Sequence, residues 1–438
     1  MRSIRILALA WLGLCVAGLA DGGENAPADA NAGQPVKKVA ALCTAYRAGW
    51  HADSIITKFL AGFPTDDGII APSVKVVSLY MDQPTPDDLG PKLAAHYGIT
   101  VFPTVSGALT LGGEKLAVDA VLFVGEHGTY PVNRFGATMY PRMRIAEEIF
   151  RVFDLSGRAV PVYIDKHLSY NWLDAKWIYD RAAELGVPLM AGSSVPLAWR
   201  NPPLEHPKGS RITEAVALTY ASPDSYGVHG VEVIECMIER RAGGERGVAS
   251  VQCVRGPAFY KAADEGKFSM ELVEAAAATV DAKKPGKMQD HAKDPTAIII
   301  NYVDGTKGTV VMTHEYYGMR WAYAARVDGQ IAACEIIFPG VRTRPGFSYL
   351  GLNIQRMFLT GKPPYPVERT LLSSGIVDVA LRSAAADGKL IETPFLNIRY
   401  QPYDSDPIRA TAAQPSGASL GPWPPDEIIG LYPPQTKK

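Results

Sequence analysis

Cysteine is scarce in this sequence, with five residues among 438. Cys43, Cys236, Cys253 and Cys334 lie too far apart to match the spacing of a zinc-binding motif. We expect these four to be small buried hydrophobic residues. An oxidising compartment would permit one disulfide, whose pairing the sequence does not indicate. The fifth, Cys15, lies in an apolar segment at the N-terminus.

An excess of charge of either sign is also absent. Lysine and arginine total 44 and aspartate and glutamate total 45, a formal net charge of -1. Such a balance creates no overall field that would attract nucleic acid or an anionic membrane surface. We therefore expect a small-molecule or protein partner and no nucleic acid. The length and the 47% hydrophobic content are sufficient for more than one core, so two domains are expected.

The N-terminal apolar run, Ile6 to Ala20, is too short to span a bilayer comfortably. It follows a basic start and ends at a small-residue cleavage site that includes Gly18. This pattern predicts a Sec-type signal peptide over residues 1–20, and hence a periplasmic or extracellular protein with no membrane association after cleavage. The bulky residue before Cys15 disfavours a lipoprotein, and no twin-arginine pair is present. Residues 21–36 are predicted to be a flexible linker.

Between residues 37 and 200, short apolar runs alternate with amphipathic stretches. This alternation is typical of βαβ units around a parallel sheet. We expect strands at Val39–Cys43, Val74–Tyr80, Ile99–Val101, Ala120–Val124, Val160–Ile164 and Pro188–Ala191. The expected helices are Asp53–Gly62, Asp87–Tyr97, Ser106–Leu111, Ile145–Phe153 and Leu173–Leu185.

The pattern changes after about residue 200, where longer alternating strands predict a largely antiparallel sheet. These strands are Ala297–Tyr302, Gly308–Met312, Trp321–Val327 and Gln330–Phe338, with helices at Met270–Thr279 and Val367–Ala386. Asp304-Gly305 and Asp328-Gly329 are well suited to hairpin turns between them. Residues 401–438, rich in proline, serine and glycine, are predicted to form an extended or partly disordered strap.

Several short motifs occur along the chain in a recognisable order. They are Asp119–Val124, Asp165–His167, Arg200–Pro202 and Gly227–Glu232. This series resembles the Gfo/Idh/MocA family of sugar oxidoreductases over about Val39 to Tyr400. The resemblance implies an α/β plan: a Rossmann-like nucleotide-binding domain over residues 37–200, then an α+β C-terminal domain over 201–400 with a largely antiparallel open sheet. It also implies a homo-oligomer formed through the C-terminal sheet.

The resemblance further implies an NAD or NADP cofactor and a carbohydrate or cyclitol substrate. Lys166 takes the place of the family's substrate-contacting lysine, and His229 that of its catalytic histidine. Glu232 stands where the family has a later aspartate, and His127, in the polar loop after the fourth strand, completes the expected catalytic set. The residues expected to bind the substrate are Asn133, Arg142, His167, Tyr170 and Arg200.

The loop after the first strand departs from the dinucleotide-binding pattern. Glycines in a Gly-x-Gly-x-x-Gly loop let the backbone approach the pyrophosphate at a helix N-terminus, but here only Gly49 remains. Arg47 and His51 could replace the backbone donors as an anion clamp. Asp82 follows the second strand, where a ribose-binding acid would lie. The expected cofactor-binding set is Thr44, Arg47, Gly49, His51, Asp82 and Glu126.

Two functions follow from these observations. The first is an NAD(P)-dependent oxidoreductase acting on a sugar or cyclitol hydroxyl through Lys166 and His229, or a related enzyme that cleaves glycosides by transient oxidation. The second is a cofactor-free or metal-dependent carbohydrate-binding protein, lyase or hydrolase on the same fold. For a metal, Glu126, His127, His167 and His229 could supply ligands, although no spacing demands one. The degenerate loop favours the second function.

Overall fold

The computed structural model describes residues 35–340 and 344–433. The predicted signal peptide and nearly all of the predicted linker, with Cys15, lie outside these residues, so both stay predictions. From Val36 onward the chain forms a single unit, which is the part described below. Within the described ranges, no helix combines the length and the hydrophobicity needed to cross a bilayer.

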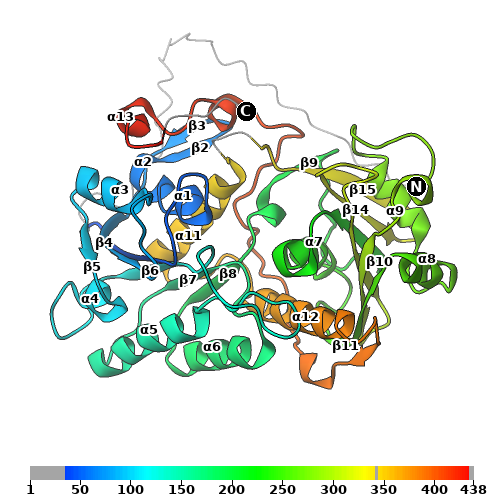
Figure 1. Ribbon diagram of the computed structural model, residues 1–438, viewed down its shortest axis with the longest axis horizontal. Coiled ribbons are helices and arrows are strands. Elements are labelled where there is room, and N and C mark those ends of the chain that lie inside the picture. Colours follow the sequence, from blue (N-terminus) through cyan, green and yellow to red (C-terminus); the bar gives the residue numbers. More distant parts are fainter. Residues whose placement is uncertain (1–34, 341–343, 434–438) are drawn as a thin grey trace, which may run out of the picture. The chain divides into compact units, whose positions relative to one another are not determined.

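The first sheet of the described chain has six parallel strands in the order β5-β4-β1-β6-β7-β8 (Figure 1). Its strands are β1 (Lys38–Cys43), β4 (Lys75–Met81), β5 (Thr100–Phe102), β6 (Ala120–Val124), β7 (Val162–Asp165) and β8 (Leu189–Gly192). Every residue of β6 is buried, as a strand covered on both faces requires. The predicted parallel sheet is confirmed. The strand order reverses between β1 and β6, where ligands bind in open α/β sheets.

Helices cover both faces of this sheet. On one face lie α4 (Val105–Thr110), α5 (Arg142–Ser156) and α6 (Trp172–Glu184). On the other lie α1 (His51–Ile55), α2 (Lys58–Ala61), α3 (Gly90–Tyr97) and, from far along the chain, α11 (Gly346–Thr360). The single helix predicted over Asp53–Gly62 is therefore two short helices. The break comes at Ile56 and Thr57, between the end of α1 and the start of α2.

The second sheet has eight strands among the described residues, in the order β16-β11-β12-β13-β10-β14-β15-β9. They are β9 (Trp199–Asn201), β10 (Ile212–Thr219), β11 (Val248–Arg255), β12 (Thr296–Tyr302), β13 (Lys307–Met312), β14 (Trp321–Val327), β15 (Gln330–Ile337) and β16 (Ile391–Glu392). Only the β10–β13 pair is parallel, so the sheet is largely antiparallel, as predicted. The two Asp-Gly turns join β12 to β13 and β14 to β15. The domain boundary expected at residue 200 falls inside β9.

Helices α7 (Val228–Ile238) and α12 (Glu368–Ala384) pack on one face of the second sheet. Helices α8 (Pro257–Asp264), α9 (Met270–Ala277) and α10 (Met288–His291) cover part of the other face. That second face is where the family resemblance places a contact between subunits, which stays a prediction. The strands β2 (Phe63–Thr65) and β3 (Gly68–Ile70) form a small separate hairpin.

The C-terminal strap packs along the unit as far as residue 433, with contacts that run from Asn353 of α11 to the segment after β1. It is extended apart from a short 3-10 turn at Gly417–Leu420 and the helix α13 (Asp426–Ile429). The Ser416 amide donates to Asp66 at 2.9 Å, and the Tyr432 hydroxyl donates to Asp53 at 2.5 Å. The strap therefore reaches the segment that follows β1. The cysteines at 43, 236, 253 and 334 are buried, as expected, and they are unpaired.

Candidate functional site

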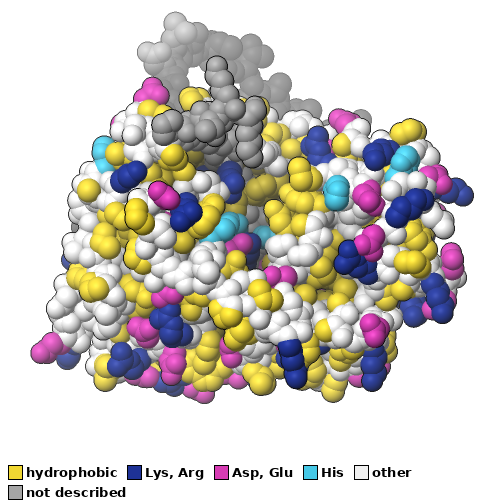
Figure 2. Space-filling view, in the orientation of Figure 1, with side chains coloured by type: hydrophobic (Ala, Val, Ile, Leu, Met, Phe, Trp, Pro, Cys, Tyr) yellow, Lys and Arg dark blue, Asp and Glu magenta, His cyan; other side chains and the backbone are white. Residues whose placement is uncertain are grey.

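A cleft of about 490 Å³ lies beyond the carboxyl ends of β1, β6 and β7. Its volume falls in the range of small-molecule sites. Residues after these strands line one side, and residues from α7, β14 and the start of α11 line the other. Figure 2 shows histidine and acidic side chains close together near the middle of this face, bordered by hydrophobic ones. The cleft thus lies where the strand order reverses, and Glu126 and His127 line it.

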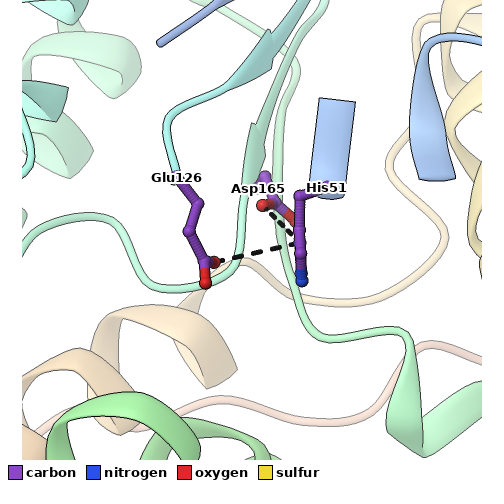
Figure 3. Close-up of side chains that lie close together, drawn as sticks. All are labelled: His51, Glu126 and Asp165. Atoms are coloured by element: carbon purple, nitrogen blue, oxygen red, sulfur yellow. Dashed lines mark hydrogen bonds and ion pairs between the residues drawn. The ribbon is translucent and has the colours of Figure 1, made fainter. Parts of the chain in front are cut away.

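Four charged or titratable side chains meet at the floor of this cleft. The Lys166 ammonium contacts the Glu126 carboxylate as an ion pair. His51 Nδ1 lies 2.9 Å from Asp165 Oδ2 and 3.8 Å from Glu126 Oε2 (Figure 3). The side chain of Asp165 is only 1% exposed, and it comes from the last residue of β7. A fully buried carboxylate therefore holds one nitrogen of a histidine whose ring borders the cleft.

The geometry of the backbone brings these groups together. Gly125 connects β6 to Glu126, and a Cβ there would lie 2.9 Å from Phe123 Cζ and 3.0 Å from Arg142 Cγ. Only glycine lets the chain pass this point without a clash. His127 and Lys166 have φ values of 71° and 63°, in the left-handed region that side-chain-bearing residues rarely adopt. Such strained positions concentrate at functional sites.

Burial sets the charge of the surrounding histidines. It lowers the pKa of His127 to about 4 and the pKa of His167 to about 3, and it places the pKa of His229 well below its usual value. These imidazoles are therefore neutral near pH 7. Burial on its own would raise the pKa of Glu126, but the neighbouring Lys166 and His51 hold that pKa well below its usual value. Glu126 is accordingly a carboxylate at neutral pH.

His229 and Glu232 lie on the same helix, α7, as predicted, but their side chains have different surroundings. His229 lines the cleft, and its Nδ1 is 2.5 Å from Ser193 Oγ. Glu232 is buried and accepts hydrogen bonds from the Ser193 amide at 2.6 Å and from the Thr370 hydroxyl at 2.7 Å. Ser193 thus connects the two side chains. Glu232 holds Ser193 in place and has no contact with the cleft.

Aromatic rings form much of the cleft wall. Trp321 stacks on Tyr226 with ring centroids 5.7 Å apart, and Trp50 stacks on His127 at 4.7 Å. The edge of Phe347 packs on His51 at 5.1 Å. Aromatic faces offer broad apolar surface, which suits the C–H faces of a sugar ring. Trp50, Tyr226 and Phe347 were not among the site residues that the sequence predicted.

The loop after β1 does not offer its backbone amides to a dinucleotide. The Gly49 amide donates to Asp53 Oδ2 at 2.7 Å, and the Tyr46 amide donates to Asp88 Oδ1 at 2.8 Å. Two carboxylates of this chain thus hold donors that a pyrophosphate would need, and they add negative charge where it would lie. The Tyr46 side chain is 1% exposed and fills the space beneath the loop.

The position of the ribose-binding acid is likewise engaged within the chain. Asp82 accepts hydrogen bonds from Tyr80 at 2.7 Å and Tyr130 at 2.8 Å and pairs with Arg144. The backbone of the loop after β6 is held close by, because the Thr129 amide donates to the Gln83 side chain at 2.7 Å. The residues present therefore do not fit a dinucleotide bound in the usual way across this sheet.

Several other predicted site residues lie outside the cleft. Thr44 donates through its hydroxyl to the Glu126 carbonyl oxygen at 2.6 Å, and Arg47 donates to the Thr85 hydroxyl at 3.1 Å. The Asn133 side chain accepts from two amides of its own loop, as a turn residue does. The remaining residues that do not line the cleft are Asp82, Arg142, His167, Tyr170 and Arg200.

Arg142 and Arg200 have separate roles away from the cleft. Arg200 is buried and donates to the Leu204 carbonyl oxygen at 2.8 Å and to Glu205 at 2.5 Å. Arg142 is fully buried, its guanidinium 5.1 Å from the centre of the Tyr140 ring. Burial lowers the pKa of Arg142, while the charges of Glu126 and other acids oppose that change. Arg142 therefore contributes positive charge behind the acidic pair at the cleft floor.

A metal-ligand arrangement is present among the described residues, but not the predicted one. Ligand atoms of His51, Glu126 and Asp165 lie within 4.8 Å of one another. Lys166 already pairs with Glu126, and Arg142 lies behind the two carboxylates. These two cations balance the two carboxylates, so no net negative charge is left to bind a divalent cation. The arrangement therefore favours Lys166 as the cationic group of the cleft.

No protein-family model and no curated protein matches this sequence. Solved structures do. GenD2 from gentamicin A biosynthesis, in complex with NAD, is 15% identical over 82% of this chain and 97% of its own, with a TM-score of 0.52. A myo-inositol dehydrogenase from Lactobacillus casei, in complex with NAD(H) and myo-inositol, is 11% identical over 82% and 97%, with a TM-score of 0.51. These similarities show the fold that the motif series predicted.

Proposed function

We propose that this chain is a carbohydrate-active lyase whose general base is the dyad of His51 and Asp165, and that it works without a bound dinucleotide. The observation that carries the proposal is the 2.9 Å contact between His51 Nδ1 and Asp165 Oδ2 in a cleft that also contains Lys166. A buried carboxylate bound to one imidazole nitrogen orients the ring and favours the tautomer whose other nitrogen accepts a proton. In Figure 3 that second nitrogen points away from both carboxylates.

The remaining groups complete an acid–base set. His51 would take a proton from a substrate carbon. The C–O bond on the adjacent carbon would break as a C=C bond forms, and the Lys166 ammonium would give a proton to the departing oxygen. Glu126 holds Lys166 in position, and the neutral His229 is placed to hydrogen-bond a substrate hydroxyl. Proton transfers of this kind contribute about 100- to 10,000-fold each.

Glycoside hydrolysis by two carboxylates is a weaker explanation of the same cleft. That reaction needs one carboxylic acid with a raised pKa. Here the pKa of Glu126 is held well below its usual value, and Asp165 lies behind His51 and does not line the cleft. Neither carboxylate is therefore suited to protonate a leaving group.

Sugars and cyclitols are the proposed substrate class. The aromatic wall and the polar floor support it, and a structure of the same fold contains myo-inositol. NAD(P)-dependent oxidation of such a substrate is the second candidate. The fold favours it, as do Lys166 and His229 in the cleft, whereas the amides held by Asp53 and Asp88 disfavour it.

One experiment separates the two candidates. The purified mature protein is denatured, and the released small molecules are analysed by mass spectrometry for NAD or NADP. In parallel, the intact protein is incubated with a panel of sugars, cyclitols and sugar acids without nucleotide, and unsaturated products are followed by ultraviolet absorbance. We expect no stoichiometric nucleotide and an unsaturated product from at least one substrate. Stoichiometric NAD(P), or products formed only when NAD(P) is added, would overturn the proposal.

A further inference from the structure

One guanidinium in the cleft, that of Arg344, is not neutralised by an ion pair within the described residues. Arg344 precedes α11 and lines both the catalytic cleft and an adjoining pocket of about 270 Å³. Its Nη1 donates to Ser54 Oγ at 3.3 Å, and no ion pair to it is formed by the described residues. A largely desolvated cation with one long hydrogen bond is unfavourable unless a ligand completes its surroundings.

Asp53, the acid whose charge acts on Arg344, already accepts hydrogen bonds at both carboxylate oxygens. Asp53 accepts hydrogen bonds from the Gly49 amide at 2.7 Å, the Thr57 hydroxyl at 2.8 Å and the Tyr432 hydroxyl at 2.5 Å. Both carboxylate oxygens of Asp53 are therefore engaged by these donors, and Asp53 forms no ion pair with Arg344. Burial lowers the pKa of the Arg344 guanidinium, and the charge of Asp53 opposes that change.

Arg344 lies at the same end of the cleft as the proposed base. Its Nη2 is 3.7 Å from where a Cβ would stand on Gly49, two residues before His51. Phe347, in the first turn of α11, packs its ring edge against the His51 ring. A ligand group that contacts Arg344 would therefore place its neighbouring atoms near His51.

We propose that the substrate carries an anionic substituent, a carboxylate or a phosphate, and that Arg344 binds it. This inference rests on the proposed function, because it assigns the substrate class of the same cleft. A planar guanidinium binds either group through two parallel hydrogen bonds. In a sugar acid, neutralising the carboxylate would also make the adjacent C–H more acidic, and this is the proton that His51 would remove. In dinucleotide-binding folds the bound anion is the pyrophosphate of the cofactor. Here an anionic group of the substrate itself would take that role.

The test measures binding by titration calorimetry with glucuronate, glucose 6-phosphate, glucose and inorganic phosphate as probes. We expect glucuronate or glucose 6-phosphate to bind about 10- to 100-fold more tightly than glucose. In Arg344→Met this preference disappears while the glucose affinity is kept, and Arg344→Lys retains part of it. The matched control is Arg356→Met, a change on α11 outside the cleft, which leaves the preference intact. The stronger of the two anionic probes identifies a carboxylate or a phosphate as the substituent.

Equal affinities for all three sugars would overturn the proposal, as would an unchanged preference in a folded Arg344→Met variant. If Arg344→Met does not fold, judged by circular dichroism, the comparison of Arg344→Lys with the parent protein decides the question. Binding does not require turnover, so the outcome is independent of the lyase reaction. A His51→Gln variant that keeps the anion preference and full turnover would contradict the proposed function but not the anion site.

Discussion

His51 Nδ1 and Asp165 Oδ2 lie 2.9 Å apart, although the two residues are separated by 114 positions in the chain. The contact joins the first residue of α1 to the last residue of β7. These elements meet because parallel strands end at the same edge of a sheet, and the helix that follows β1 starts at that edge. His51, which the sequence predicted as part of an anion clamp, lies between the carboxylates of Asp165 and Glu126, and the proposed function assigns it as the base.

The Asp165→Asn variant tests the dyad. We expect kcat to fall about 100-fold or more while KM changes little, because the amide no longer favours the reactive tautomer of His51. Steady-state kinetics on the substrate found in the product screen measures both constants. Tyr163→Phe is the control, since its hydroxyl is 3.4 Å from the other Asp165 oxygen and should matter far less. A variant with unchanged kcat would exclude the dyad as the base.

The Lys166–Glu126 ion pair predicts how substitutions of these two residues change the free energy of unfolding. Its side chains are 8% and 13% exposed, so Lys166→Met leaves a buried carboxylate without its cation. We expect a loss of about 3 kcal/mol in the free energy of unfolding, which Glu126→Gln in the same chain should largely restore. Urea unfolding of both single variants and the double variant measures this coupling. If the double variant loses as much free energy of unfolding as the two single variants together, the two side chains do not stabilise each other.

Acid should destabilise the protein through its buried histidines. The pKa of His167 is about 3 in the folded chain against 6.5 for an unperturbed histidine, so the unfolded state binds more protons between these values. Stability from this group is complete above about pH 6.5 and falls toward pH 3, by about 3 kcal/mol at pH 4. His127 contributes in the same direction.

Thermal denaturation at several pH values checks this expectation. The melting temperature of His167→Asn should fall less steeply between pH 6.5 and pH 4 than that of the parent protein. His96→Asn, a change at an exposed position on α3, should leave the slope unaltered. Identical slopes for all three proteins would show that His167 is not the group responsible.

Chelation should leave the protein unaffected. Because Lys166 and Arg142 already balance the carboxylates at the cleft floor, we expect no change in melting temperature or turnover after treatment with EDTA. Elemental analysis of the untreated protein should find no stoichiometric divalent metal. A tightly bound ion whose removal abolishes turnover, and whose return restores it, would instead assign His51, Glu126 and Asp165 as its ligands.

Local pattern alone was enough to predict much of the fold. The strand Ala120–Val124 and the strand Trp321–Val327 have the bounds that hydrophobic periodicity predicts. The two Asp-Gly turns of the second sheet predicted the hairpins that contain them, because turn geometry depends on adjacent residues. The order of strands and helices also placed Glu126 and Lys166 at one edge of the sheet, since both follow parallel strands.

Only the tertiary structure decided which side chains pair. Lys166 directly follows Asp165 in the chain, but it has a left-handed backbone and pairs with Glu126, while Asp165 binds His51. Asp53 and Asp88 accept hydrogen bonds from the amides of the loop after β1, and no spacing in the sequence predicts these contacts. Arg344 reaches the cleft from the start of α11 and had no local signal at all. Contacts of this kind depend on distances between residues far apart in the chain, and so they follow from packing and not from sequence pattern.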